Sequence, residues 1–200
     1  MKLKAFCLHF FLISFLAFSL NVQAFEATTS DATLSPSTIF KSDPESCVSP
    51  RNNLGKMLKN NGFTQVSVKE KKNGFDYYEA GVSYPSYVKT FTKEGYTVRY
   101  KYAIYADDTR KDNVEFDWVE ITFPSKSAMN KFLDSLKESI KHKGYNIYTY
   151  PGYPNWNCIG DDDSQLKEGM AWPYDQYLIK GNTVTFHETK GMCPHGSFGD

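Results

Sequence analysis

Residues 114–144 read VEFDWVEITFPSKSAMNKFLDSLKESIKHKG, in which an extended segment runs into a helical one. Within Ser125–Lys143 the apolar residues recur at spacings of three and four, so the pattern predicts a helix with one buried face. Ser125 or Ser127 can cap its first turn, and Gly144 supplies the stop after it. This strand–helix unit is scaffold and indicates no particular chemistry.

In the strand that precedes the helix, Val114–Phe123, the apolar residues fall at even positions as far as Trp118 and at odd positions from Val119 on. A β-bulge near Trp118 would explain the change, and the alternative is a central strand covered on both faces. The preceding segment, Tyr96–Ala106, alternates between apolar and polar residues. That alternation is typical of an antiparallel strand with one packed face and one wet face.

Three further elements are expected upstream. A short helix begins with Ser49 as its cap, and a strand follows over Thr64–Lys71. Asn73-Gly74 then separates two alternating runs, which is a strong hairpin signal. The partner strand is expected over Phe75–Tyr84, with Pro85 at its end.

After the long helix we expect a strand over Tyr145–Tyr150, a loop rich in Pro and Gly, and a polar, irregular segment over Cys158–Glu168. A last hairpin joins Gln176–Lys180 to Thr183–Glu188. The order of elements predicts an α+β fold. We expect an antiparallel sheet of about five to seven strands, with one long and one short helix packed on one face.

The first 24 residues have the three parts of a secretory signal peptide. Lys2 and Lys4 give a positive start, Ala5–Leu20 is almost wholly apolar, and small residues precede a cut after Ala24. The apolar run is shorter than the roughly 20 residues that span a bilayer as a helix. We therefore expect a periplasmic or secreted protein whose signal peptide is removed.

The mature chain is expected to consist of an arm and one domain. Residues 25–45 are rich in Ser, Thr, Asp and Pro without an apolar period, which predicts a flexible arm. Residues 46–200 are long enough for a single α+β domain. Removal of Lys2 and Lys4 from the 23 basic residues leaves 21 against 23 acidic ones, a net charge of −2. This balance argues against nucleic-acid binding, and no later apolar stretch is long enough to span a membrane.

Three cysteines remain after cleavage: Cys47, Cys158 and Cys193. In an oxidising compartment two of them are expected to pair. We favour a disulfide between Cys158 and Cys193, which would tie a Pro-rich loop and the tail to the last hairpin and leave Cys47 free. The rival pairing, Cys47–Cys193, would join the two ends of the domain. Closure of so long a loop stabilises a protein by about 3–4 kcal/mol.

A metal site is an alternative interpretation of the C-terminal residues. His187, Cys193 and His195 bring imidazole and thiolate within nine residues, and these ligands suit copper or zinc. Their spacing matches no zinc-finger pattern. A disulfide-bonded Cys193 with two exposed histidines is therefore favoured, and no cofactor is expected.

A loop-like stretch late in the chain is rich in tyrosine and tryptophan. Such side chains often serve as rigid anchors at interfaces, and they also stack on sugars. The alternative is that they form a satellite core, since tryptophan is highly buried on average. The candidate binding residues are Tyr150, Tyr153, Trp156, Trp172 and Tyr174, with Tyr177 nearby.

Acid catalysis has weak support. Glu115, Asp117 and Glu120 share one strand, where charged residues most often meet water. Nothing places two carboxylates across a cleft, as glycoside hydrolysis requires. The chain also lacks a Gly-x-Ser-x-Gly turn and a Gly-rich phosphate loop.

These features predict an exported, non-enzymatic binding protein that sequesters a protein or glycan partner in the bacterial envelope. In general outline it is similar to periplasmic immunity and inhibitor proteins, although no matched motif carries the similarity. The first alternative is an envelope copper- or zinc-binding protein that uses His187, Cys193 and His195. The second is a hydrolase with an unrecognised acid pair.

Overall fold

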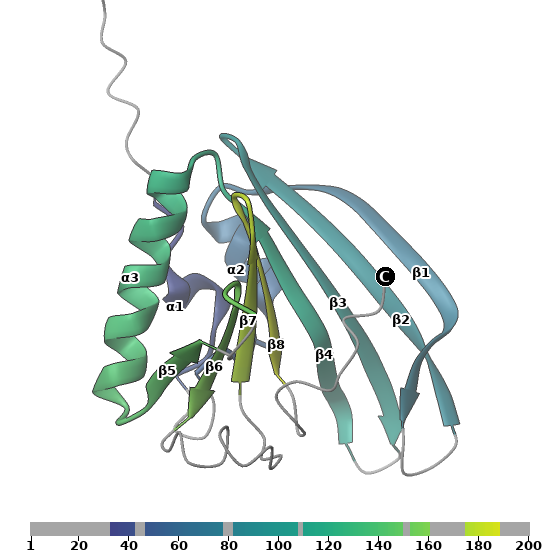
Figure 1. The fold of residues 1–200 in the computed structure, drawn as a ribbon. Coiled ribbons are helices and arrows are strands. Elements are labelled where there is room, and N and C mark those ends of the chain that lie inside the picture. Colours follow the sequence, from purple (N-terminus) through teal and green to yellow (C-terminus); the bar gives the residue numbers. More distant parts are fainter. Residues whose placement is uncertain are drawn as a thin grey trace, which may run out of the picture. The chain divides into compact units, whose positions relative to one another are not determined.

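The computed structural model describes residues 33–42, 47–77, 82–107, 110–149, 153–160 and 175–188. Most of them lie in an antiparallel sheet of eight strands, ordered β1-β2-β3-β4-β8-β7-β6-β5 (Figure 1). The expected antiparallel sheet is confirmed, but five to seven strands is too low a number. The strands are β1 (Thr64–Tyr77), β2 (Val82–Lys93), β3 (Tyr96–Asp107), β4 (Arg110–Thr122), β5 (Asn146–Thr149), β6 (Trp156–Gly160), β7 (Asp175–Lys180) and β8 (Thr183–Glu188).

The two halves of the sheet repeat one arrangement. Strands β1–β4 form one antiparallel meander and β5–β8 a second, and the two meet where β4 pairs with β8. Helix α2 (Leu54–Asn60) precedes the first meander and α3 (Lys126–His142) the second. Helix α2 approaches Tyr100 of β3, and α3 approaches Phe186 of β8. Tyr100 and Phe186 both register with Val119, so the two contacts lie on one face of the sheet, called here the helix side.

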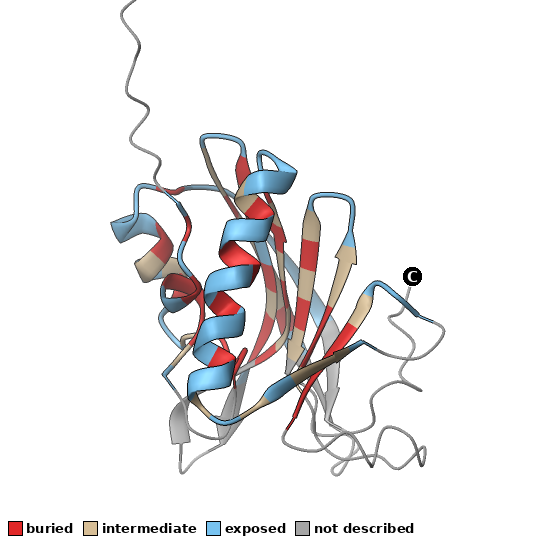
Figure 2. Ribbon diagram, turned by 60° about the vertical axis from the view of Figure 1, so that its left-hand side comes forward, coloured by how far each residue is buried: buried red, intermediate tan, exposed pale blue. Residues whose placement is uncertain are grey.

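Helix α3 confirms the sequence prediction closely. The Ser125 hydroxyl oxygen accepts a hydrogen bond from the Ala128 amide at 3.1 Å, as an N-cap should. Gly144 follows the helix with φ of +86°, a conformation that favours glycine. The predicted apolar face is buried and runs along the helix as a stripe (Figure 2). Its buried members are Met129, Phe132, Leu133, Leu136 and Ile140.

The short helix begins later than expected. Helix α2 starts after Asn53, and Ser49 is buried outside it. The reason is that Pro50 forms a β-bridge with Phe40, which holds this part of the chain in an extended conformation. The prediction of a helix that starts at Ser49 is therefore wrong.

Residues 33–42 differ from the flexible arm that was predicted over residues 25–45. Within residues 33–42, a short helix α1 (Pro36–Ile39) packs into the core, where Ile39 is fully buried and Phe40 nearly so. The Asp175 carboxylate further accepts hydrogen bonds from the amides of Cys47 and Val48. Residues 33–42 thus belong to the compact unit Thr33–Asp200.

The Asn73-Gly74 hairpin is not formed. Both residues lie inside β1, which continues to Tyr77, and β2 runs through Pro85. Between the pairs Lys71↔Ser86 and Phe75↔Tyr84, strand β1 has more residues than β2. This bulge leaves Pro85 without a register partner on β1, which suits a residue that has no amide hydrogen to donate.

The bulge expected near Trp118 is confirmed. Lys101 pairs with Trp118 and Tyr102 with Phe116, so Asp117 is the extra residue in β4. Buried Phe116 and Val119 therefore differ by three positions yet both face the core.

The last part of the sheet is partly as predicted. The hairpin of β7 and β8 forms, with Val184 and Phe186 buried. Cys158, by contrast, lies in strand β6, not in an irregular segment. Among the described residues, no helix is both long and apolar enough to cross a bilayer.

Candidate functional site

The structure describes only part of the predicted aromatic site. Tyr153 is 56% exposed, and its ring meets that of Trp156 edge-on at 5.9 Å. Tyr177, by contrast, is 2% exposed and packs in the core against Phe186. Three more candidates, Tyr150, Trp172 and Tyr174, lie outside the described residues.

The predicted disulfide and metal ligands are also only partly described. Cys47 is a buried free thiol, and burial raises its pKa to about 11 although Lys143 lowers it. Cys158 carries no titrating thiol, but Cys193 and His195 lie outside the described residues, so the pairing stays a prediction. Among the described residues, no group of three or more metal-ligating side chains comes together.

The candidate strand carboxylates Asp117 and Glu120 are engaged with cations, and the side chain of Glu115 lies outside the described part of the structure. Asp117 lies 2.6 Å from the Lys101 ammonium, and Glu120 lies 2.8 Å from the Arg99 guanidinium. His187 is near Asp117, but burial outweighs that attraction and lowers the pKa of the imidazole, so His187 is neutral at pH 7. These contacts give Asp117 and Glu120 each a structural partner.

A pocket of about 540 Å³ lies between α2 and the first meander, on the helix side. Its origin is a mismatch in length. Helix α2 has 7 residues, about 10 Å, whereas β1–β4 have 12 to 14 residues each, about 40 Å. The helix therefore covers only part of the strands. We call this pocket the basic groove, and it is lined by Asn52, Asn53, Leu54, Gly55, Lys56, Lys59, Asn60, Gln65, Lys89, Tyr100, Tyr102, Ile104 and Phe116.

The floor of the basic groove is aromatic. The ring of Tyr100 stacks on Phe91 at 5.9 Å, and it lies 5.8 Å from Phe116. Tyr102 stacks on Tyr87 at 5.4 Å. These packed rings make the floor rigid, because each ring is held by its neighbours.

Gly55 lets α2 approach this floor closely. A Cβ at position 55 would lie 2.8 Å from the Tyr100 hydroxyl oxygen, so a larger residue cannot be accommodated without a shift. Burial, followed by the neighbouring Tyr102, raises the pKa of Tyr100 far above its ordinary value. The hydroxyl thus stays protonated.

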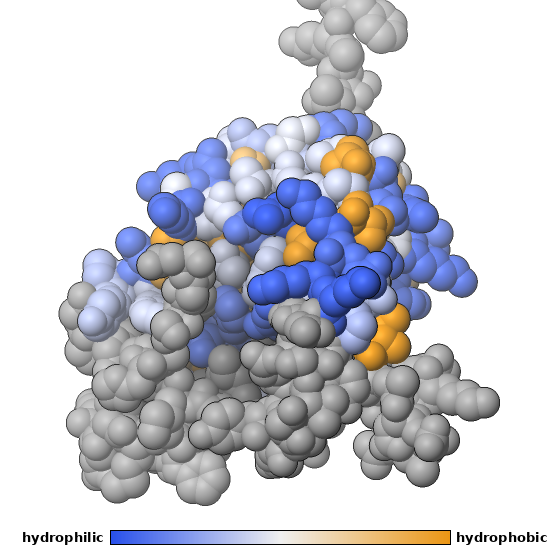
Figure 3. Space-filling view, turned by 90° about the vertical axis from the view of Figure 1, so that its right-hand side faces the viewer, coloured by the Kyte–Doolittle hydropathy of each residue, from blue (hydrophilic) through white to orange (hydrophobic). Residues whose placement is uncertain are grey.

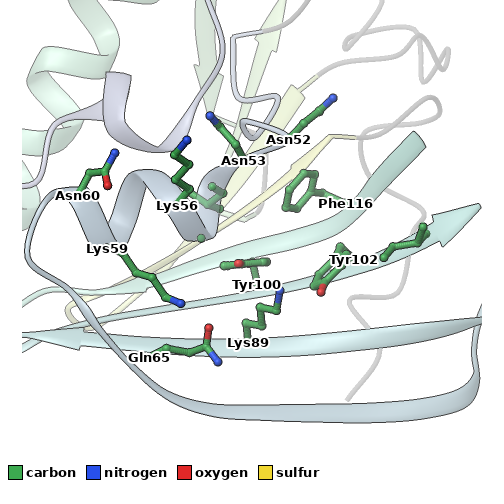
Figure 4. Close-up of a pocket in the computed structure, with 13 residues that line it drawn as sticks. Asn52, Asn53, Lys56, Lys59, Asn60, Gln65, Lys89, Tyr100, Tyr102 and Phe116 are labelled. Carbon is green, nitrogen blue, oxygen red and sulfur yellow. The ribbon is translucent and has the colours of Figure 1, made fainter. Parts of the chain in front are cut away.

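The rim of the groove is positively charged. Lys56 and Lys59 come from α2 and Lys89 from β2, and among the described residues no Asp or Glu lines the pocket. Figure 4 shows Lys59 extending from α2 while Lys89 and Gln65 rise from the strands into the same pocket. The Lys89 ammonium lies 4.9 Å from the centre of the Tyr102 ring, a cation–π contact. The asparagines and Gln65 add neutral hydrogen-bonding groups.

Exposed aliphatic side chains gather at the same surface. Four large hydrophobic residues are exposed among the described residues: Val66, Val68, Ile104 and Tyr153. Ile104 lines the groove, Val66 follows the lining residue Gln65, and Val68 is the register partner of Lys89. Figure 3 shows this side of the molecule, where apolar spots lie among hydrophilic side chains.

Sequence reasoning missed the basic groove because its residues are distributed over five segments, the one that contains α2 and strands β1 to β4. Lys56 and Lys59 look like the solvated face of a short helix, and Lys89 lies between two predicted strands, Phe75–Tyr84 and Tyr96–Ala106. The alternation of Tyr100 and Tyr102 pointed to a packed face, but it could not show that α2 leaves that face partly uncovered. Comparisons of the chain with protein-family models, curated proteins and solved structures give no match.

Proposed function

We propose that this protein is an exported, non-enzymatic binding protein that sequesters an acidic partner in the cell envelope. The observation that carries the proposal is the basic groove, where the described lining residues place three lysines and no carboxylate around an aromatic floor. The whole chain has a formal net charge of zero, so this local excess is not a consequence of a basic composition. A local positive field attracts and orients an anionic partner.

The lining of the groove supports binding rather than turnover. The lining residues within the described part of the chain include no His, Cys, Asp, Glu or Ser, the side chains that most often act as nucleophile or general base. Lysine, tyrosine and asparagine can donate hydrogen bonds to carboxylate, sulfate or phosphate oxygens. A rigid floor limits the conformational entropy lost on binding.

Export is part of the proposal and rests on residues 1–24. A cut after Ala24 leaves Phe25 as the N-terminus, which mass spectrometry of the mature protein measures directly. In the oxidising envelope we propose that Cys158 pairs with Cys193. Cys47 then remains the single free thiol of the mature chain.

The partner class in the proposal is a protein or a glycan, and an inhibitor or immunity role fits either. The copper- or zinc-binding alternative needs Cys193 and His195, which lie outside the described residues. The hydrolase alternative gains no support from Asp117 and Glu120, because each is paired with a cation. We therefore retain the binding function.

The test is titration of the mature protein with two defined anionic probes, a short polyglutamate and an oligogalacturonate, by calorimetry at low ionic strength. The variant Lys56→Glu/Lys59→Glu/Lys89→Glu should bind at least about tenfold more weakly, about 1.4 kcal/mol. The matched control, Lys126→Glu/Lys141→Glu/Lys180→Glu, changes the net charge equally at exposed sites outside the groove and should bind normally.

Each outcome has a clear meaning. Selective loss in the groove variant supports the proposal, and the probe that binds more tightly indicates the partner class. Equal loss in both variants would mean that net charge, not the groove, drives binding. Absence of binding by either probe contradicts an acidic partner.

A further inference from the structure

Strand β1 forms a long open edge of the sheet. It is the first strand in the sheet order, and within the described residues its only strand partner is β2. It has 14 residues, whereas the opposite edge strand, β5, has 4. An edge strand presents a row of backbone N–H and C=O groups that can pair with another extended chain.

This edge is exposed and carries both apolar and basic side chains. Over Thr64–Lys72 every side chain is exposed except that of Ser67, which is half-buried. Val66 and Val68 are 55% and 49% exposed. Three lysines follow them within the sequence VKEKK, against a single glutamate, Glu70.

The charges select the kind of strand that can pair with β1. A second copy of this chain would bring the lysines of two β1 strands together, and like charges across a strand pair are destabilising. Lysines on an edge strand are a common protection against such self-association. An acidic strand would instead be attracted, since its carboxylates would face Lys69 and Lys71 on one side of the sheet. On the other side, Val68 offers an apolar contact next to Lys89.

The aromatic floor of the groove argues for a peptide over a stacked sugar. A sugar ring needs an open aromatic face to stack on. The ring of Tyr102 is already covered, because it stacks on Tyr87 at 5.4 Å and the Lys89 ammonium lies 4.9 Å from its centre. Tyr100 is likewise stacked on Phe91, with an interplanar angle of 11°. The open features at this surface are aliphatic side chains, ammonium groups and the backbone of β1.

We infer that an extended acidic segment of a partner protein binds by adding a strand to the free edge of β1, with acidic residues alternating with branched aliphatic ones. The inference rests on the proposed function, because the positive field of the groove lysines attracts the acidic segment to this edge, whereas Lys69 and Lys71, on the opposite side of the sheet from Lys89, face its carboxylates. Backbone hydrogen bonds to β1 supply affinity, and the alternating side chains supply specificity.

The probe is a synthetic ten-residue peptide of alternating Glu and Val with capped ends, added to the mature protein. Amide hydrogen exchange is followed by NMR over residues 64–72. Strand addition should slow exchange at alternate amides of β1, those that do not bond to β2, because only these face the new strand. Protection elsewhere, with none in β1, would overturn the inference.

Two N-methylated peptides test the backbone contact directly. One carries N-methyl groups on its Glu residues and the other on its Val residues. In an antiparallel pair, alternate residues direct their amides to the partner strand, so one peptide should lose binding and the other keep it. Equal binding of both peptides would show purely electrostatic attachment and would overturn strand addition.

Charge variants separate this inference from the proposed function. Lys69→Glu/Lys71→Glu should weaken peptide binding by about tenfold, and the effect should shrink at high salt. If groove reversal at Lys56, Lys59 and Lys89 weakens binding while β1 gains no protection, the proposed function stands and strand addition is wrong. If β1 is protected but groove reversal has no effect, strand addition stands and the role of the groove is wrong.

Discussion

At the scale of single residues, the shape of the basic groove depends most directly on Gly55. An added Cβ would lie 2.8 Å from the Tyr100 hydroxyl oxygen and 3.4 Å from Phe91 Cζ. Both rings are buried and stack on one another, so neither can move aside freely. The glycine is therefore required by close packing, although it lies inside a helix where glycine is unfavourable.

We expect Gly55→Ala to destabilise the protein by about 1 kcal/mol. Overpacking costs about 1–3 kcal/mol, and the better helix propensity of alanine offsets roughly 1 kcal/mol of that. Urea denaturation measures the change in the free energy of unfolding.

A double-mutant cycle with Tyr100→Phe identifies the cause. Tyr100→Phe removes the hydroxyl that the new methyl group would meet, so Gly55→Ala should cost much less in that background. An unchanged cost in the two backgrounds would contradict the predicted clash.

At the scale of elements, α3 is the one whose local sequence signals agree with each other. Its apolar stripe, its N-cap and the glycine after it all indicate the same helix, and the structure has that helix. Most such signals are independent of the rest of the chain, because they concern hydrogen bonds and spacings within one or two turns.

Loss of the α3 cap should therefore have a defined cost. Ser125→Ala leaves the Ala128 amide without its side-chain acceptor, and we expect a loss of about 1 kcal/mol in the free energy of unfolding. Ser135→Ala, at an exposed position inside α3, is the matched control and should change stability by no more than a few tenths. Chemical denaturation compares the two, and equal effects would argue against the cap.

Other elements show where a local pattern is overridden. Asn73-Gly74 is a strong hairpin signal, yet it lies in a bulge of β1 opposite Pro85. Strand β6 covers the end of a predicted loop and the start of the segment predicted to be irregular, yet it pairs with both β5 and β7. Strand pairing is a long-range interaction, and its hydrogen bonds can outweigh a local turn preference.

At the scale of the whole molecule, Phe40 ties the N-terminal segment to the centre of the fold. Its ring lies 4.9 Å from that of Phe186 in β8 and 6.5 Å from that of Phe132 in α3. One side chain from the predicted arm thus contacts the last strand and the long helix. The segment around it is part of the core.

We expect Phe40→Ala to destabilise the protein by about 3–5 kcal/mol, because a buried ring is lost and a cavity remains. Ser42→Ala, two residues further on and exposed, should be nearly neutral. Thermal and urea denaturation of the two variants test this difference. A small effect at Phe40, similar to that at Ser42, would mean that these residues are a dispensable arm.

The candidate site belongs to this largest scale, which explains why it was not predicted. Its lysines lie at positions 56, 59 and 89, its tyrosines at 100 and 102, and Phe116 is further on. No spacing rule connects them, since their proximity depends on strand order and on the short length of α2. The aromatic residues that were predicted as a binding site cluster in sequence but are only partly described in the structure.

From the chain alone one can read the α+β class, the antiparallel sheet, the long helix with its two ends, the bulge in β4 and the final hairpin. Each depends on contacts between residues close in sequence, where period and capping are sufficient evidence. The eight-strand order, the burial of Leu34, Ile39 and Phe40 and the basic groove became visible only in three dimensions. They arise from contacts between distant segments, whose free energies no local pattern encodes.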